Sequence, residues 1–567
     1  MKKELLCAAY LTDLVKNKNT PEFSKLDIDR VLGHLKRNKI PLLYLDHNEN
    51  FNWFFNSDQF RKSYQEELKL CQRRKKEYLL LKRAFREAGI PLILFKSSGR
   101  FTYVGSDLDV LVKSKDRSRI YALMKELGYI RMSEGKGSEP YKIAYRKLYG
   151  DFSYYDAEFY ENIVWFSHFT DANLLFERSK TSKNGENIEI LSNEDRVLSV
   201  IAHCLYQSKS ITLSDVTDIR FSIGRDFDYS YIFSIASRKG WINGLYRGIY
   251  LISKIEERLY GEIVFDSAIV ADAMTHCGKR WRSWVGHNIE EIELPLNLPH
   301  WHIRFLYVKK IFSDQDVTYY SKVRDFIGVA LKAVRGRVFK HNYGFLIAFS
   351  GIDGAGKTSM ATEARRSFKR HTEISKKPKL TWSRVDGHRI TNLVYKLSQP
   401  LIGKKFNTFR DVEKAEILRR YLPVRYIWTY LNVLGLLAKF LIKIQTPIIL
   451  QKKVIICDRY NYDVIVDIIS LLPDDDINRK IVTSLFRFLA PKPDVTFLLN
   501  VDPVAAYERL AEFDKQRLGI DMVRRRARLY LELAKGIRKL YVIENNNDIK
   551  SITNIVTKIS LEKYFEK

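Results

Sequence analysis

The stretch Ser350-Gly-Ile-Asp-Gly-Ala-Gly-Lys-Thr-Ser359 decides the fold of the C-terminal part of this 567-residue chain. It follows the apolar run FLIAFS, and a helical pattern begins at its lysine. The spacing fits GxxxxGK[ST], in which backbone N–H groups surround phosphates at a helix N-terminus. The lysine supplies positive charge to the transferring phosphate, and the threonine hydroxyl ligates Mg²⁺. The motif therefore predicts a nucleoside-triphosphate site made of Gly351, Asp353, Gly354, Ala355, Gly356, Lys357, Thr358 and Ser359. A Gly-rich turn with a chance GKT is the weaker alternative, because a strand and a helix flank the motif.

The chain after this motif alternates apolar runs with helical patterns, which predicts an α/β fold with a parallel sheet covered on both faces. Expected strands are TWSRV, VIICDR and DVTFLLN. Open sheets of this kind bind ligands at the carboxyl ends of their strands, and VIICDR ends there in Asp458 and Arg459. The aspartate is a candidate for the Mg²⁺ shell or for orienting the acceptor, and the arginine for bridging donor and acceptor phosphates. A surface ion pair is the alternative.

A second candidate site lies near the N-terminus, in the expected strand DLDVLV. Asp107 and Asp109 are two residues apart on this strand, so both project from one face and can share a divalent ion. Gly105 and Ser106 precede them in a tight turn whose N–H groups can approach a triphosphate. A solvated strand edge is the alternative.

Such a metal site needs a third carboxylate from a neighbouring strand. The alternating segment FSYYDAEFY offers Asp156 and Glu158 on one face, and we favour Glu158 because it lies centrally in the strand. Metal ions held by three carboxylates activate an attacking oxygen and stabilise leaving pyrophosphate.

The C-terminal region resembles the thymidylate kinase family through residues 350–359, 457–460 and 494–510. The resemblance implies a P-loop NTPase fold and Mg²⁺-dependent transfer of a phosphoryl group from ATP to a nucleoside monophosphate such as dTMP, or to a related phosphorylated acceptor. It further implies that Asp353 contacts the acceptor sugar and Arg459 holds phosphate. A homodimer is a further expectation from the family.

Other acceptor contacts are expected from residues whose environment departs from the family pattern. Arg384 and Arg425 are candidates for the acceptor pocket, and for Arg425 a buried aromatic helix is the alternative. Asn461 to Val464 replace the family's Ser and Ala-Tyr-Gln run near the base, which leaves the base open. A basic lid is expected from Arg517, Arg524, Arg525, Arg526 and Arg528, and a solvated helix face is the alternative for the last four.

The N-terminal region resembles a family of largely uncharacterised nucleotidyltransferases through residues 89–98, 106–112 and 191–219. The resemblance implies a mixed α/β domain with helical parts on both sides of it. Lys96 occupies a family lysine position, but Ser97 replaces the glycine that follows. His203 lies on an apolar helix, where a core histidine is a better interpretation than a metal ligand.

Composition adds constraints on class and partners. The formal net charge of +29 favours phosphate-bearing partners, nucleic acid or an anionic membrane surface, although it also fits simple solubility. Five scattered cysteines argue against a disulfide framework and favour the cytoplasm. The N-terminus lacks the features of a signal peptide. We expect residues 1–300 to form the nucleotidyltransferase-like domain, 301–342 a basic helical linker and 343–567 the kinase domain.

These observations leave three functions open. The first is a kinase fused to a nucleotidyltransferase. The second is a nucleotidyltransferase acting on a sugar, a metabolite or an RNA end, with the phosphate-binding loop as a sensor. The third is an ATPase that associates with nucleic acid or membrane.

Overall fold

The computed structural model describes most of the chain. The residues described are 3–12, 26–47, 51–95, 107–134, 141–149, 153–163, 168–182, 188–327, 344–372, 378–382, 437, 440–469, 477–535, 537, 539–544 and 549–566. The chain separates into two compact units, one up to residue 338 and one from 339 onward, with the short segment 148–154 counted with the second. The finer division with a linker over 301–342 stays a prediction, because residues 328–343 lie outside the described part.

The second unit is built on a five-stranded sheet with the order β11-β12-β10-β13-β14, in which every neighbouring pair is parallel. Its strands are β10 (Phe345–Ser350), β11 (Lys379–Trp382), β12 (Val454–Asp458), β13 (Val495–Asn500) and β14 (Leu540–Glu544). β10, β12 and almost all of β13 are buried, as expected for central strands of a sheet covered on both faces.

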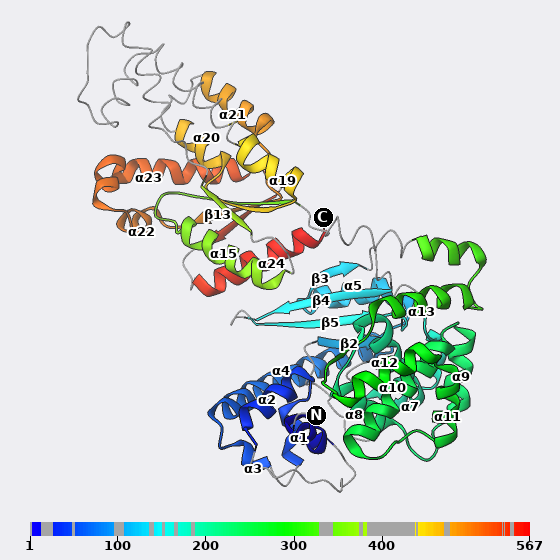
Figure 1. The fold of residues 1–567 in the computed structure, drawn as a ribbon. Coiled ribbons are helices and arrows are strands. Elements are labelled where there is room, and N and C mark those ends of the chain that lie inside the picture. The colour runs from blue at the N-terminus through cyan, green and yellow to red at the C-terminus, as the bar shows by residue number, and fades with distance from the viewer. Residues whose placement is uncertain are drawn as a thin grey trace. The chain divides into compact units, whose positions relative to one another are not determined.

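Helices lie on both sides of this sheet. α15 and α24 lie on one side, and α19, α20 and α23 lie on the other (Figure 1). The helices of this unit are α15 (Lys357–His371), α19 (Thr446–Gln451), α20 (Asn461–Ile469), α21 (Ile477–Leu489), α22 (Pro503–Glu508), α23 (Glu512–Ala534) and α24 (Ile549–Glu566). The predicted P-loop NTPase fold with a parallel sheet is confirmed.

The first unit contains a mixed seven-stranded sheet with the order β3-β4-β5-β2-β1-β7-β6. Its strands are β1 (Ile93–Leu94), β2 (Asp107–Leu111), β3 (Ile130–Glu134), β4 (Lys142–Leu148), β5 (Tyr154–Tyr160), β6 (Lys180–Thr181) and β7 (Glu189–Ile190). β2 pairs in parallel with β5, while β1 pairs antiparallel with β2. β1 is short and contributes two residues to the ladder.

Along the sequence, helices come before, between and after the strands of this sheet. Those before and within it are α1 (Lys3–Thr12), α2 (Ile28–Arg37), α3 (Phe51–Phe54), α4 (Asp58–Glu87), α5 (Arg117–Glu126) and α6 (Ala172–Glu177). The longest of these is α4, which Ser57 caps by accepting a hydrogen bond from the backbone N–H of Phe60.

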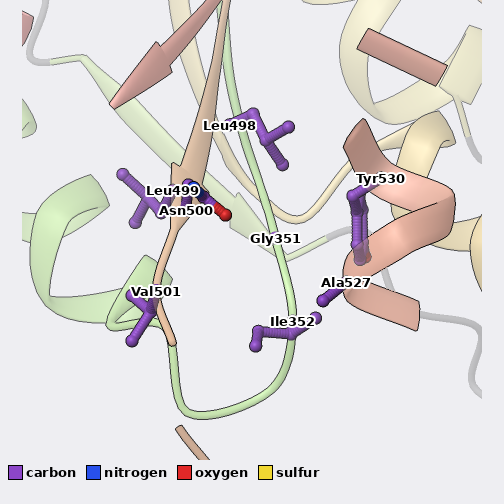
Figure 2. A pocket seen from close by; sticks show the side chains of 8 residues that line it. All are labelled: Gly351, Ile352, Leu498, Leu499, Asn500, Val501, Ala527 and Tyr530. Carbon is purple, nitrogen blue, oxygen red and sulfur yellow. The ribbon is translucent and has the colours of Figure 1, made fainter. Parts of the chain in front are cut away.

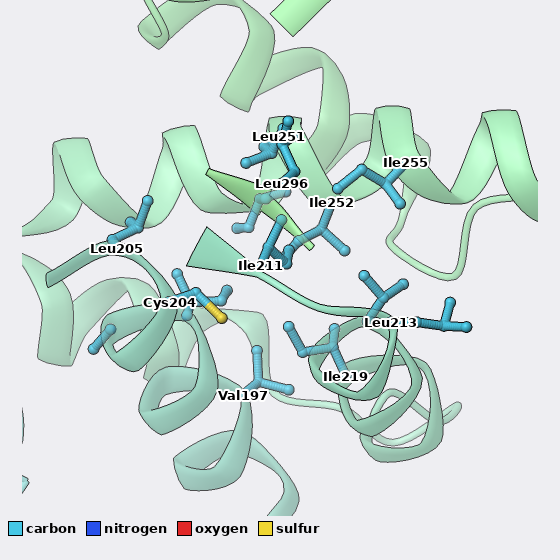
Figure 3. Close-up of a cluster of buried hydrophobic side chains, with 14 of the residues drawn as sticks. Val197, Cys204, Leu205, Ile211, Leu213, Ile219, Leu251, Ile252, Ile255 and Leu296 are labelled. Atoms are coloured by element: carbon cyan, nitrogen blue, oxygen red, sulfur yellow. The ribbon is translucent and has the colours of Figure 1, made fainter. Parts of the chain in front are cut away.

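The helical half that follows supplies most of the core of this unit. Its helices are α7 (Asn193–Ala202), α8 (Leu213–Ser222), α9 (Tyr229–Arg238), α10 (Ile242–Tyr260), α11 (Ser267–His276), α12 (Lys279–Glu290) and α13 (His300–Ser313), with the short strands β8 (Ser210–Ile211) and β9 (Leu296–Asn297) between them. Figure 3 shows Val197, Ile219 and Ile252 converging from three of these helices. No helix in the described ranges is long and apolar enough to cross a membrane.

Candidate active sites

The phosphate-binding loop, residues 351–358, joins β10 to α15. Gly351, Gly354 and Gly356 have φ values of 147°, 84° and 82°, a region that residues with a Cβ rarely adopt. A Cβ on Gly354 would also lie 2.2 Å from the carbonyl oxygen of Ala506. The loop path therefore requires glycine, and it leads directly into the N-terminus of α15.

Lys357 is buried at the first turn of α15, with its ammonium group directed back into the loop. Its Nζ donates hydrogen bonds to the carbonyl oxygens of Gly351 at 2.5 Å and Ile352 at 2.8 Å. Burial lowers the pKa of Lys357, and the carboxylate of Asp463 acts in the opposite direction. The loop thus holds a buried cation where the motif predicts contact with phosphate.

Thr358 and Asp458 meet at the end of β12. The hydroxyl of Thr358 donates to Oδ2 of Asp458 at 2.6 Å. The other carboxylate oxygen of Asp458, Oδ1, is buried and has no hydrogen-bond partner. A buried carboxylate oxygen without a partner beside a hydroxyl fits an Mg²⁺ ligand set, since Mg²⁺ prefers oxygen donors.

Asp353 is the centre of a cluster of basic groups from three elements. The guanidinium of Arg459 contacts the Asp353 carboxylate closely. A guanidinium nitrogen of Arg526 lies 3.7 Å from Oδ2 of Asp353, and Nζ of Lys357 lies 3.8 Å from its Oδ1. Burial alone would lower the pKa of Arg459, but the nearby carboxylates, first that of Asp353, outweigh burial and raise it. The structure therefore brings the predicted residues Asp353, Lys357, Asp458 and Arg459 to one edge of the sheet.

Asp463 is a residue of this site that our sequence analysis did not assign to it. Its carboxylate is buried and accepts hydrogen bonds from the hydroxyls of Ser350 and Tyr530 and from the backbone N–H of Tyr460. It also lies 3.9 Å from Nζ of Lys357. Asp463 therefore connects α20, the end of β10 and α23 to the loop lysine. In the sequence, the one local feature that could have assigned Asp463 to the site is its position five residues after Asp458, on the first turn of the next helix.

The arginines expected in a lid separate in the structure. α23 contains a break at Gly519, with φ 65° and ψ 154°. Beyond it Arg526 is only 12% exposed and pairs with Asp467 at 3.1 Å as well as with Asp353, so a solvated face is the wrong interpretation for this residue. Arg524 is 53% exposed and pairs with Asp521, as a solvated face predicts. Arg528 is exposed and Arg525 is half-buried. The Arg517 side chain lies outside the described part.

A small pocket lies beside the loop, between it, the end of β13 and α23. Gly351 and Ile352 line it on the loop side, Asn500 and Val501 on the strand side, and Ala527 and Tyr530 on the helix side (Figure 2). Tyr530 is thus at once a wall of this pocket and a donor to Asp463. Burial raises the pKa of Tyr530 well above its ordinary value, with Asp463 as the next cause, so the hydroxyl remains a donor.

The second site lies where β2 and β5 pair. Asp109 lies opposite Glu158 in the register of the two strands, and Asp107 lies opposite Asp156. One carboxylate oxygen from each of Asp107, Asp109 and Glu158 lies within 4.8 Å of the others. These three form the one group of potential metal ligands among the residues that the structure describes. Three carboxylates this close fit a divalent ion with oxygen ligands.

The other candidate for the third carboxylate has a different partner. Both carboxylate oxygens of Asp156 accept from Arg146 on β4 at 2.6 Å. Burial raises the pKa of Asp156, and the hydrogen bond from Arg146 opposes this rise. Glu158 accepts from Lys142 at 2.7 Å and from the hydroxyl of Tyr160 at 2.6 Å, and it still faces Asp109. The geometry therefore favours Glu158.

The structure describes some of the remaining candidate residues and not others. Ser359 is exposed in the first turn of α15. His203 shares a 2.6 Å hydrogen bond with Gln207 and is not in the carboxylate group. The candidates Lys96, Gly105, Ser106, Arg384 and Arg425 lie outside the described residues.

Comparisons with known proteins found a family match in each of the two units. Residues 24–255 match a family model described as an uncharacterised nucleotidyltransferase, and residues 436–556 match the thymidylate kinase model. A protein described as "Probable thymidylate kinase" from Staphylothermus marinus is 28% identical over 234 residues, which cover 39% of this chain and 96% of that protein. One from Archaeoglobus fulgidus with the same description is 24% identical over 221 residues, covering 38% and 93%.

The two matches lie in different units of the fold. The nucleotidyltransferase match contains the three carboxylates, and the thymidylate kinase match contains Asp458, Arg459, Asp463 and Arg526. Both families are transferases that act on nucleotides. The chain is therefore a transferase that joins a nucleotidyltransferase-like segment to a thymidylate kinase-like segment.

Proposed function

We propose that the second unit transfers the γ-phosphoryl group of ATP to a nucleoside monophosphate of the dTMP type or to a related phosphorylated acceptor. The observation that carries this proposal is the arrangement around the loop. Thr358 pairs with Asp458 beside the buried Lys357, and Arg459 and Arg526 converge on Asp353 from the end of β12 and from α23.

The donor side of the reaction rests on the loop and its lysine. Backbone N–H groups at the start of α15 bind the phosphates of ATP, because the positive end of the helix dipole and free N–H donors meet there. Lys357 then exchanges its bonds to Gly351 and Ile352 for phosphate oxygens. Thr358 and Asp458 would hold Mg²⁺, which supplies charge neutralisation on the phosphate oxygens.

The acceptor side rests on the two arginines. A guanidinium binds phosphate through two parallel hydrogen bonds, so Arg459 and Arg526 can hold the acceptor phosphate in line with the donor. In the structure both contact Asp353, which keeps them in place before phosphate arrives. No protein nucleophile is required, since positioning and electrostatics account for most catalysis in phosphoryl transfer.

For the first unit we propose Mg²⁺-dependent nucleotidyl transfer at Asp107, Asp109 and Glu158. Their close carboxylates would hold the ion, which activates the attacking oxygen and stabilises leaving pyrophosphate. Lys142 neutralises part of this negative charge through Glu158. A chain in which only this unit is active, with the second as a sensor, is the second candidate function, and the carboxylate group supports its nucleotidyltransferase part.

Product analysis separates these functions. The intact chain is incubated with Mg²⁺, ATP labelled in the α or γ position, and a panel of nucleoside monophosphates and sugar phosphates. Kinase activity releases ADP and labels the acceptor from the γ position, and Lys357→Ala removes it. Nucleotidyl transfer releases pyrophosphate and labels the product from the α position, and Asp109→Ala removes it while Lys357→Ala does not. ATP hydrolysis without any acceptor requirement would contradict both proposals and favour an ATPase.

A further inference from the structure

Helix α13 is apolar on two opposite faces. One face is buried in the core of the first unit by Ile303, Leu306, Tyr307 and Ile311. The other carries Trp301 and Phe305, each 63% exposed, and Phe312, 44% exposed. These rings are spaced by four and seven residues, which places them on one stripe of the helix. Exposed large aromatic side chains gathered on one stripe mark an interaction surface.

Positive charge surrounds the outer stripe. Arg304 and Lys309 are exposed and flank the rings on either side of the stripe, and α13 contains no acidic residue. Lys322 donates to the carbonyl oxygen of Phe312 at 3.1 Å, which adds an ammonium group at the end of the stripe. Lys209 is close enough to Arg304 that repulsion, after burial, lowers the pKa of the lysine.

The stripe continues beyond the end of α13. The ring of Phe326, in the helical segment 319–327, lies 5.7 Å from that of Phe312 and is 37% exposed. Tyr319 and Tyr320 are 70% and 87% exposed in the same segment. Exposed aromatic side chains thus follow one another over two consecutive helical segments.

We propose that the outer stripe of α13, defined by Trp301, Phe305 and Phe312, docks the protein on an anionic lipid surface. Aromatic rings settle at the boundary between headgroups and acyl chains, and flanking Arg and Lys bind lipid phosphates. A second copy of this chain is a poorer partner, because Arg304 and Lys309 would face the same positive groups. The inference concerns a surface outside both catalytic sites, so it stands or fails independently of the proposed function.

Vesicle sedimentation of the full chain tests the docking. We expect binding to vesicles of phosphatidylcholine with roughly one third phosphatidylglycerol, much weaker binding to phosphatidylcholine alone, and a decline as salt rises. Trp301→Ala with Phe305→Ala should lower the partition coefficient about tenfold or more, since both rings leave the lipid boundary. Arg304→Gln with Lys309→Gln should weaken binding and flatten its salt dependence.

Phe488→Ala is the matched control, because this ring on α21 is 86% exposed but lies outside the stripe. All the variants change exposed side chains, so their thermal unfolding and ATP turnover in solution should match the parent. The proposal is wrong if the parent chain does not bind anionic vesicles, or binds them equally well after the Trp301 and Phe305 changes. It is equally wrong if the parent is a dimer in solution that those two changes convert to a monomer, since a second copy then covers the stripe.

Discussion

The two candidate sites handle charge in opposite ways. Around the phosphate-binding loop, the carboxylates of Asp353 and Asp463 are balanced by Lys357, Arg459 and Arg526 within the protein itself. In the first unit, three carboxylates gather within 4.8 Å of one another, and Lys142 pairs with Glu158 at 2.7 Å.

The difference shows what each site requires from its ligand. The loop site is held together before any substrate arrives, so its residues need only exchange partners when phosphate binds. The carboxylate site concentrates negative charge that a cation must offset, because like charges so close raise each other's energy. The first site is therefore expected to retain its geometry without metal, and the second to depend on it.

Asp458→Asn should produce the largest effect. Loss of the carboxylate beside Thr358 removes the expected Mg²⁺ ligand and should reduce phosphoryl transfer by about three orders of magnitude. Steady-state ADP formation with the best acceptor measures this. Thr358→Ser is the matched control, because it keeps the hydroxyl that donates to Asp458 and should retain most activity. A small loss in Asp458→Asn would place Mg²⁺ elsewhere.

Glu158→Gln and Asp156→Asn test which carboxylate of β5 completes the metal site. The first removes one charge from the metal group and should lower pyrophosphate release by about a hundredfold, whereas the second leaves the group intact. Asp156→Asn should instead lower the free energy of unfolding by roughly 1 to 3 kcal/mol, because Arg146 loses its charged partner. Mn²⁺ binding followed by calorimetry separates the two variants. If both variants lost the same metal affinity, the strand register of β5 would not decide whether Glu158 or Asp156 binds the metal.

Asp463→Asn tests whether this carboxylate tunes the loop lysine. Asp463 opposes the effect of burial, so its neutralisation should lower the pKa of Lys357 further. The alkaline limb of the kcat profile should then move to lower pH, with kcat reduced about tenfold at neutral pH. Asp353, Asp458 and Arg459 also face this lysine and are unchanged. Tyr530→Phe removes a hydrogen bond to Asp463 without removing charge, and its alkaline limb should stay in place.

The last prediction concerns how the stability of the first unit depends on pH. Burial raises the pKa of Glu256 on α10 to about 8, with Arg220 opposing the rise. Between the ordinary pKa of a glutamate and about 8, the folded state keeps a proton that the unfolded chain has released. Stability should therefore fall as pH rises through this window, by at most about 1.4 kcal/mol per pH unit. Urea unfolding at several pH values checks this, and Glu256→Gln should remove the slope.

The sequence predicted best what is contiguous in the chain. All residues of the loop lie within ten positions, and their backbone geometry follows from glycine at 351, 354 and 356. The carboxylate of Asp458 could be predicted equally well, because this residue ends an apolar run.

What the sequence did not reveal depends on tertiary packing. Asp463 reaches Lys357 only because β12 lies beside β10 in the sheet. The sequence does not distinguish Arg526 from its neighbouring arginines, because its contact with Asp353 depends on the packing of α23 against the loop. The choice between Asp156 and Glu158 depends on strand register and on Arg146, and neither is visible in the alternating pattern of β5.

That register has a consequence for folding fidelity. Asp156 and Glu158 lie on the same face of β5, so a slip of two residues would keep the alternation of polar and apolar side chains. It would, however, place Asp156 opposite Asp109 and remove Phe159 from its stack on Phe85 in the core. The ion pairs from Lys142 and Arg146 on the neighbouring β4 add to this packing in favouring the observed alignment. The contacts that hold the sheet in register therefore also select which carboxylate of β5 reaches the metal site.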